Sequence, residues 1–266
     1  MLSGSTSSEA DETVPRIAVV SQGTVAERVA AALREEIAAG EWPIDAMLPA
    51  EHQLMKRFEI SRPSCREALR ILQSEGLVRV ERGSRGGARV LPPDASRIAT
   101  NSAVLLQMRK ATISEVFETR IIIESACVAA FTARATQPLL SELAQNAASQ
   151  RYLVHERPAF YARGREFREI LVENCGSESL RLMGLVIGGI ADRQLSLLSV
   201  ELPYDPGQTE RFLKSIRLKE EMIAAIERGD AEGAAECWRT YLRRYLADLH
   251  EHLPKNLRNL KPFPLD

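Results

Sequence analysis

The sequence has no apolar run near the roughly 18 residues that a membrane-spanning helix needs. Residues 1–16 are polar and acidic, and they lack the basic start and the apolar stretch of a signal peptide. The four cysteines lie far apart without a CxxC pair, which speaks against a disulfide framework or a thiolate zinc site. We therefore expect a cytoplasmic protein with no membrane partner.

Aromatic residues make up only 5% of the 266-residue chain, whereas 45% of the residues are hydrophobic and 27% are charged. This composition is sufficient for a globular core, and the abundance of Ala, Leu, Arg and Glu favours helices over strands. The net charge is only −1, so affinity for a nucleic acid must come from a local basic patch. At about 150 residues per domain, the length allows one large domain or two small ones.

Signatures of catalysis are also missing. The sequence has no Gly-rich phosphate loop, no GxSxG or HExxH motif, and no cysteine with an evident histidine partner. The Arg85-Gly86-Gly87 stretch is a turn without a following helix, so it is not a dinucleotide-binding loop. An enzyme is the main alternative from another functional class, but we predict that the protein is not one.

The first part of the chain predicts three helices followed by a hairpin. Apolar residues at four-residue spacing and Gly40 indicate a helix from Thr24, and Leu48-Pro49 begins a short second helix. Ser61 is a good N-cap for a third helix that ends at Gly76. Residues 77–82 and 88–91 alternate like paired strands, and Pro92-Pro93 then marks a domain boundary.

Beyond Pro93 the pattern is helical throughout, with amphipathic segments that suit a bundle. Asp205-Pro206 opens one of these helices, and Gly229-Asp230 closes it and caps the next. The expected helices are 96–109, 113–135, 138–154, 158–174, 178–199, 207–228 and 231–252.

Residues 56–89 form a basic segment, with nine Lys or Arg against four Glu. A short helix, a tight turn, a second helix and a glycine-tipped basic hairpin make a winged helix-turn-helix. The second helix of that motif enters the major groove, where Arg can bond bidentately to guanine. The alternative is a solvated charged surface, but the order of the elements favours DNA. The exposed N-terminal face of this helix would offer Ser61, Arg62, Ser64 and Arg66.

Residues 24–91 resemble the DNA-binding domain of the GntR family of bacterial transcription regulators. The resemblance implies that Arg62 and Arg66 reach the operator, that Ser61 and Ser64 contact phosphates, and that Arg82 and Gly83 lie at the wing tip. His52 stands where relatives often carry Arg, and it joins the predicted DNA contacts. The matching stretches run from Gly40 through Leu48-Pro49-Ala50-Glu51, from Ser61-Arg62-Pro63-Ser64 through Arg70, and from Leu72 through Glu75-Gly76-Leu77-Val78.

The helical remainder resembles the FCD effector domain of the FadR-type subfamily. The resemblance implies a bundle of six or seven helices that encloses a small-molecule pocket and supplies dimer contacts, so the expected fold class is mainly α. The expected domains are a disordered tail (1–22), a winged helix-turn-helix domain (23–93), a helical effector-binding and dimerisation domain (94–253) and a C-terminal tail (254–266). The matching pieces are Glu118-Thr119-Arg120 with Glu124, Glu166-Phe167-Arg168-Glu169-Ile170-Leu171 with Gly176, and Ile226-Glu227-Arg228-Gly229-Asp230.

Many relatives of this kind hold a divalent metal through an Asp and three His. The resemblance places Gly164, Arg168, Lys219 and Tyr241 at those positions, and none is a plausible ligand. We therefore predict no metal and no cofactor. Instead, Arg168, Lys219 and Tyr241, joined by Arg120, would bind a carboxylate, phosphate or CoA-type anion. The alternative is that these residues form ordinary ion pairs on the surface or within the bundle.

The segment 183–190 could line an apolar cavity or could be plain core. Its three glycines, Gly184, Gly188 and Gly189, are unusual in a helix, and either close helix packing or room for a ligand would explain them.

Together these features predict a homodimeric transcription regulator that binds double-stranded operator DNA. It would be a repressor, released by a small acidic metabolite such as a fatty acid, an acyl-CoA or another organic acid. The alternative is an architectural or ligand-independent dimeric DNA-binding protein, which the lack of an overall basic charge disfavours.

Overall fold

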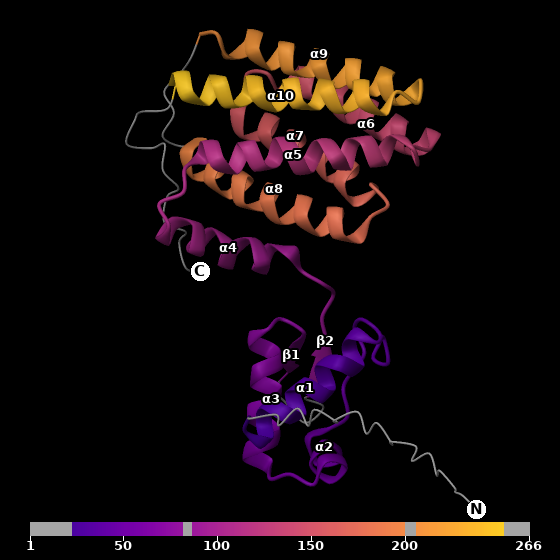
Figure 1. Ribbon diagram of the computed structural model, residues 1–266, viewed down its shortest axis with the longest axis vertical. Coiled ribbons are helices and arrows are strands. Elements are labelled where there is room, and N and C mark those ends of the chain that lie inside the picture. Colours follow the sequence, from indigo (N-terminus) through magenta and orange to yellow (C-terminus); the bar gives the residue numbers. More distant parts are fainter. Residues whose placement is uncertain (1–22, 82–86, 200–205, 253–266) are drawn as a thin grey trace, which may run out of the picture. The chain divides into compact units, whose positions relative to one another are not determined.

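The computed structural model describes residues 23–81, 87–199 and 206–252, and the chain divides into two compact units, Met1–Pro93 and Asp94–Asp266 (Figure 1). The division falls at the Pro92-Pro93 pair of the sequence. The two predicted tails, 1–22 and 254–266, lie outside the described residues.

The first unit contains helices α1 (Val25–Ala38), α2 (Glu51–Phe58) and α3 (Arg62–Ser74), followed by strands β1 (Val78–Glu81) and β2 (Gly87–Val90). Thr24 begins α1 through a capping box, because its hydroxyl accepts from the Glu27 N–H while the Glu27 carboxylate accepts from the Thr24 N–H. Gly40 takes a positive φ of 79° directly after the helix. The predicted order of elements is confirmed.

The turn between α2 and α3 is only three residues long, from Glu59 to Ser61. Glu59 ends α2 in the left-handed conformation, with φ of 54°. Ser61 then caps α3 by accepting from the Ser64 N–H, and Pro63 lies in the first turn. Helix α3 packs on α1, α2 and β1, and their shared core includes Leu33, Leu54, Leu72 and Val78. This core holds α3 in place while its polar face stays exposed.

The hairpin is antiparallel, with Val78 opposite Val90 and Glu81 opposite Gly87. The connection between α1 and α2 joins it through a bridge between Met47 and Arg89. Residues 82–86 at the hairpin tip are outside the part of the chain that the structure describes.

Seven α-helices make up the described part of the second unit, in agreement with the predicted mainly α fold. Residues 151–153, expected to continue a helix, instead form a 3₁₀ turn. Helix α9 has Gly207 as its N-cap rather than Asp205, which lies outside the described residues. The helices are α4 (Ala95–Met108), α5 (Ile113–Thr132), α6 (Gln137–Gln150), α7 (Arg157–Glu173), α8 (Glu178–Ser199), α9 (Gln208–Glu227) and α10 (Ala231–His252).

Helix α5 is the centre of this bundle, because it packs against α7, α8 and α10 (Figure 1). Large apolar side chains fill the space around it, among them Phe117, Phe131, Phe167 and Trp238, all at most 2% exposed. Each fully buried side chain of this size contributes about 1.5–3 kcal/mol of hydrophobic free energy. Polar side chains also lie inside the bundle, and they form the candidate ligand site. In the described residues, no helix is both long and apolar enough to span a bilayer.

The glycines of α8 serve close packing. A Cβ on Gly184 would lie 2.8 Å from Cγ1 of Val172, and a Cβ on Gly189 would lie 3.2 Å from Ala99. A Cβ on Gly188 would overlap the guanidinium of Arg168. Val186, Ile187 and Ile190 belong to the core, so the plain-core interpretation of residues 183–190 is the correct one.

Candidate nucleic-acid interface and ligand cavity

The first turn of α3 carries the predicted base and phosphate contacts. Ser61, Arg62 and Arg66 are exposed, and Ser64 is half-buried beside Ser61, with 3.0 Å between their hydroxyl oxygens. A helix N-terminus presents backbone N–H groups that attract phosphates. This turn therefore combines cationic side chains, hydroxyl groups and a favourable helix dipole.

The two predicted base-reading arginines differ in their surroundings. Arg62 has no hydrogen bond or ion pair to any described residue. Arg66 is 3.2 Å from a carboxylate oxygen of Glu51, which belongs to α2. An exposed pair of this kind contributes at most about 1 kcal/mol, so a DNA phosphate or base can replace Glu51 as the partner. His52 is exposed in the first turn of α2.

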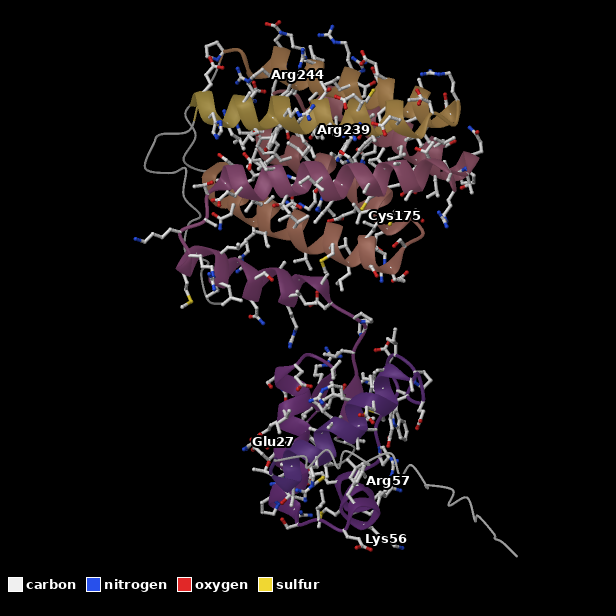
Figure 2. All side chains as sticks on the ribbon, viewed as in Figure 1. Glu27, Lys56, Arg57, Cys175, Arg239 and Arg244 are labelled. Atoms are coloured by element: carbon white, nitrogen blue, oxygen red, sulfur yellow. The ribbon has the colours of Figure 1, made fainter. Side chains whose placement is uncertain are left out.

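Several residues of the basic segment are paired within the first unit. Lys56 and Arg57 lie in the last turn of α2 (Figure 2). Arg57 donates two hydrogen bonds to the carboxylate of Glu36 on α1. These bonds hold the pKa of Glu36 below its ordinary value, although burial alone would raise it. The basic surface is therefore smaller than the sequence count indicates. The predicted wing-tip contacts, Arg82 and Gly83, lie outside the described residues.

A cavity of about 230 Å³ lies among α5, α7, α8 and α10 of the second unit. Three of the four predicted effector residues, Arg120, Arg168 and Tyr241, line it, together with Gly164. Its lining includes a polar and an aromatic group of side chains, which we call the polar wall and the aromatic wall. The polar wall contains Arg120, Arg165, Arg168 and Asp192, and the aromatic wall contains Phe160, Tyr161, Tyr241 and Tyr245.

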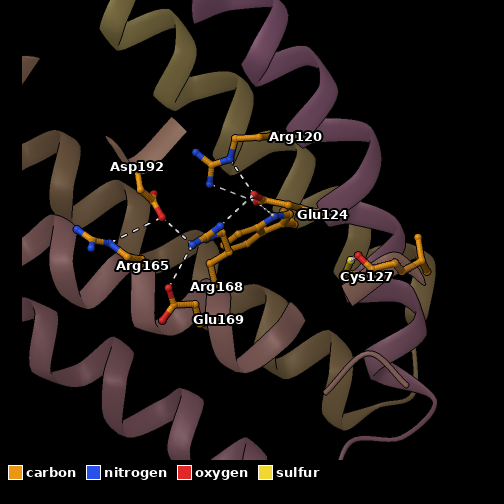
Figure 3. Close-up of polar contacts among 9 residues, drawn as sticks. Arg120, Glu124, Cys127, Arg165, Arg168, Glu169 and Asp192 are labelled. Atoms are coloured by element: carbon orange, nitrogen blue, oxygen red, sulfur yellow. Dashed lines mark hydrogen bonds and ion pairs between the residues drawn. The ribbon is translucent and has the colours of Figure 1, made fainter. Parts of the chain in front are cut away.

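Buried ion pairs hold the polar wall together (Figure 3). Arg120 bonds to Glu124 one turn later on α5, with 2.7 Å between Nε and Oε1. Arg168 bonds to Asp192 of α8, with 2.6 Å between Nη2 and Oδ2. Burial alone would lower the pKa of Arg120, but the charges of Glu124 and Asp192 raise it above its ordinary value. Arg120 and Arg168 thus form ion pairs within the bundle, and their role in effector binding stays a prediction.

Arg168 nevertheless keeps two donors without an acceptor. Its side chain is 3% exposed, and neither Nε nor Nη1 has a hydrogen-bond partner in the described residues. Leaving a buried donor unsatisfied costs about 1–3 kcal/mol, so such groups mark places where a further acceptor fits. Arg168 lines the cavity, but Nη1 itself lies against Gly188 of α8 and 4.0 Å from Oε1 of Glu124, so an anion in the cavity would reach these donors only after a small shift of the guanidinium.

Lys219, the fourth predicted effector residue, lies behind Gly164 and does not line the cavity directly. Its Nζ donates to Oε1 of Gln150 at 2.7 Å and lies over the rings of Phe167 and Tyr241, 5.2 and 4.9 Å from their centroids. Burial, to 1% exposure, lowers the pKa of Lys219 to about 7. The neighbouring Glu220 pairs with Arg151 instead.

Of the four positions at which the family resemblance leads us to look for metal ligands, Gly164, Arg168 and Tyr241 line the cavity and Lys219 lies beside Gly164, but these residues do not fit a metal. Gly164 has no side chain, Arg168 offers only N–H donors and a positive charge, and Nζ of Lys219 is bonded to Gln150 and enclosed by aromatic rings. Burial raises the pKa of Tyr241, so this phenol keeps its proton. Within residues 23–81, 87–199 and 206–252, no group of three His, Cys, Asp or Glu could hold a metal ion.

Family models match both units. The model described as bacterial regulatory proteins of the gntR family matches residues 25–90, and the FCD domain model matches residues 115–244. The chain belongs to the GntR family of bacterial regulatory proteins. Both predicted domain types are confirmed, while assignment to the FadR-type subfamily stays a prediction.

Curated relatives of this GntR-family chain are named as repressors. The HTH-type transcriptional repressor NanR of Cronobacter sakazakii is 31% identical over 147 residues, 54% of each chain. NanR of Klebsiella aerogenes is 30% identical over 156 residues, which are 58% of this chain and 59% of the relative. The chain thus spans little more than half the length of these two relatives. NanR of Salmonella newport is 25% identical over 231 residues, 85% of each chain.

A solved GntR structure from Streptococcus agalactiae has the same fold, with a TM-score of 0.62 at 20% sequence identity, over 84% of this chain and 99% of that one. The named relatives are regulators, in agreement with the prediction that the GntR-family chain is not an enzyme.

The sequence analysis did not identify the acidic partner of Arg168 or the amide partner of Lys219 in the second unit. Asp192 lies 24 residues from Arg168, and Gln150 lies 69 residues from Lys219. One signal in the sequence could have indicated these partners. Asn146 and Gln150 are polar residues four positions apart, so they lie on the same face of α6, and that face is buried.

Proposed function

We propose that this protein is a homodimeric transcription repressor that binds operator DNA and releases it when a small organic acid binds. The observation that carries the proposal is the presence, in one chain, of a helix with an exposed basic N-terminal turn and a separate cavity lined by arginines. The names of the relatives support repression rather than activation.

For DNA binding, α3 would enter the major groove. Arg62 and Arg66 would bond to base edges, while Ser61, Ser64 and His52 would contact the backbone. Arg82 and Gly83 remain proposed contacts of the wing. Two subunits would place two such helices in the half-sites of a near-palindromic operator.

For effector binding, the cavity favours a compact acid. Its volume of about 230 Å³ lies below the range of roughly 300–1,000 Å³ for drug-sized ligands, so a short-chain or single-ring carboxylate fits better than an acyl-CoA. The guanidinium of Arg168 would take the carboxylate, and the aromatic wall would cover the apolar part. No metal would take part, because the four positions offer no ligand set.

The test is an operator-release assay with compact acids such as benzoate and hexanoate. An operator is first selected from random DNA with the full-length protein. An acid should then raise the thermal midpoint of the protein and lower its operator affinity, and Arg168→Ala should lose both responses. Arg163→Ala, an exposed arginine of the same helix, is the matched control.

Operator binding that no acid changes would instead support the alternative, a ligand-independent dimeric DNA-binding protein. A stoichiometric metal bound within the bundle would contradict the metal-free part of the proposal.

A further inference from the structure

The buried charges around the cavity balance before any ligand enters. Arg120 and Arg168 are at most 5% exposed, and they face the carboxylates of Glu124 and Asp192. Arg165 also approaches Asp192, but its side chain is 43% exposed and water screens its charge. Glu169 likewise bonds to Arg168 at 3.4 Å, but its side chain is 44% exposed and water screens its charge too. Two buried cations therefore meet two largely buried carboxylates, and the two exposed groups at the edge, Arg165 and Glu169, are opposite in charge.

An acid that binds to Arg168 upsets this balance. Its carboxylate brings one negative charge into a low-dielectric space in which each existing cation already has a counter-ion. An uncompensated buried charge is strongly unfavourable, so another group has to supply a positive charge. The group best placed to do so is Lys219.

Every element packed around Lys219 leaves its amine without a counter-ion. Helix α6 contributes Gln150, whose amide is oriented by its own bond to Asn146 at 2.7 Å. Helix α7 contributes the rings of Phe160 and Phe167 together with Gly164, and α10 contributes Tyr241. Tyr241 is the one titratable side chain among these contacts in the described chain, and burial keeps it protonated.

Gly164 connects the amine to the cavity. It lines the cavity, and a Cβ at this position would lie 3.6 Å from Nζ of Lys219. No side chain of residue 164 shields the amine from a charge in the cavity. An ammonium has three N–H donors, and Gln150 accepts only one of them, so a nearby anion would also satisfy unused donors.

We infer that binding of an acid in this cavity is coupled to the uptake of one proton by Lys219. In the empty protein above pH 7, Lys219 is mainly a neutral amine bonded to Gln150. In the complex, it is an ammonium that balances the carboxylate held by Arg168. The inference rests on the proposed effector function and makes the response of the regulator dependent on pH.

The coupling has a measurable consequence. If one proton is taken up per acid bound, the dissociation constant rises about tenfold for each pH unit above the pKa of Lys219 in the empty protein. Burial places that pKa at about 7. The acid should therefore bind tightly below pH 7 and progressively more weakly at pH 8 and 9.

The experiment is calorimetric titration of the full-length protein with benzoate and hexanoate from pH 6 to 9. At pH 8, two buffers with different ionisation enthalpies report the number of protons taken up. We expect about one proton per acid and a tenfold weakening from pH 8 to pH 9 in the wild type. Lys214→Met, a half-exposed lysine on the same helix, should behave like the wild type.

Two variants assign the proton to Lys219. Lys219→Met should bind the acids more weakly, with no proton uptake and no pH slope, because it has no amine. Lys219→Arg should also show no proton uptake, because it is charged at every pH used. It keeps the inference testable if the methionine variant does not fold.

Acid binding without proton uptake, or uptake that persists in Lys219→Met, would overturn the inference and leave the proposed effector site standing. Failure of both acids to bind at pH 6 would overturn the acid site and the inference together. Operator binding is measured in the same samples, so a failure of the DNA-binding proposal is seen separately.

Discussion

Single residues of the same type have different roles in this protein because their partners differ. Arg120 is fully engaged with Glu124, whereas Arg168 keeps two unsatisfied donors. Lys219 is the most unusual residue, a lysine that is 1% exposed and without a carboxylate partner in the described chain. A buried lysine without a counter-ion destabilises the folded protein when its amine is charged.

The first prediction concerns that cost. The folded pKa of Lys219 is about 7, below its unfolded value of about 10.4, so the unfolded chain binds more protons between these limits. The wild type should therefore gain stability relative to Lys219→Met as pH rises from 7 to 9, by about 1 kcal/mol per pH unit. Urea unfolding at pH 7, 8 and 9 measures the difference. A difference that does not change with pH would show that Lys219 is charged throughout.

The second prediction concerns Arg62, the exposed arginine at the start of α3. Arg62→Ala should weaken operator binding by about 1–3 kcal/mol and reduce the preference for operator over random DNA. Lys56→Ala, which removes an exposed charge from α2, should weaken both kinds of binding by similar factors if that residue meets only phosphates. Fluorescence anisotropy at fixed salt distinguishes the two. Unchanged operator affinity of the Arg62 variant would contradict the proposed reading role.

At the scale of elements, helix α8 shows how a glycine can leave space for a charged side chain of a neighbouring helix. Gly188 leaves the space that the Arg168 guanidinium occupies, so α8 can pass close to α7. In the same helix, Asp192 binds that guanidinium one turn later. The position of Arg168 thus depends on two residues of one helix, one through its small size and one through its charge.

The third prediction follows from this arrangement. Gly188→Ala should destabilise the protein by about 1–3 kcal/mol, because the new Cβ displaces the guanidinium, and should abolish the acid response. Gly164→Ala on α7 is the control for stability only, because Gly164 itself lines the cavity; its Cβ would meet Lys219 at an ordinary 3.6 Å. That change should be neutral or stabilising by up to about 1 kcal/mol through helix propensity. Equal loss in both variants would contradict this role for Gly188.

At the scale of the whole molecule, each chain carries one reading helix in its described part, and a near-palindromic operator presents two half-sites. The fourth prediction is that sedimentation shows a dimer at micromolar concentration, with two subunits bound per operator. A monomer, with one subunit per operator, would contradict the dimer proposal.

Local signals explain how much of the fold was predictable. Thr24, Ser61 and Asp230 each cap a helix through atoms three or fewer residues away, so their roles can be seen in a short stretch of sequence. The same is true of the positive φ at Gly40 and Gly76, which end α1 and α3. The sequence by itself therefore determined the order of the helices, the hairpin and the two kinds of domain.

Only the tertiary structure decided the chemistry of the cavity. The sequence contains Arg120, Arg168 and Lys219 as three similar cations, and only Arg120 has its buried partner, Glu124, nearby in the chain. Asp192 and Gln150 reach Arg168 and Lys219 through packing between helices, over separations of 24 and 69 residues. Burial and counter-ions set the pKa of a side chain, and both depend largely on which distant helices meet. The lowered pKa of Lys219 and the unsatisfied donors of Arg168 therefore could not be predicted from the sequence.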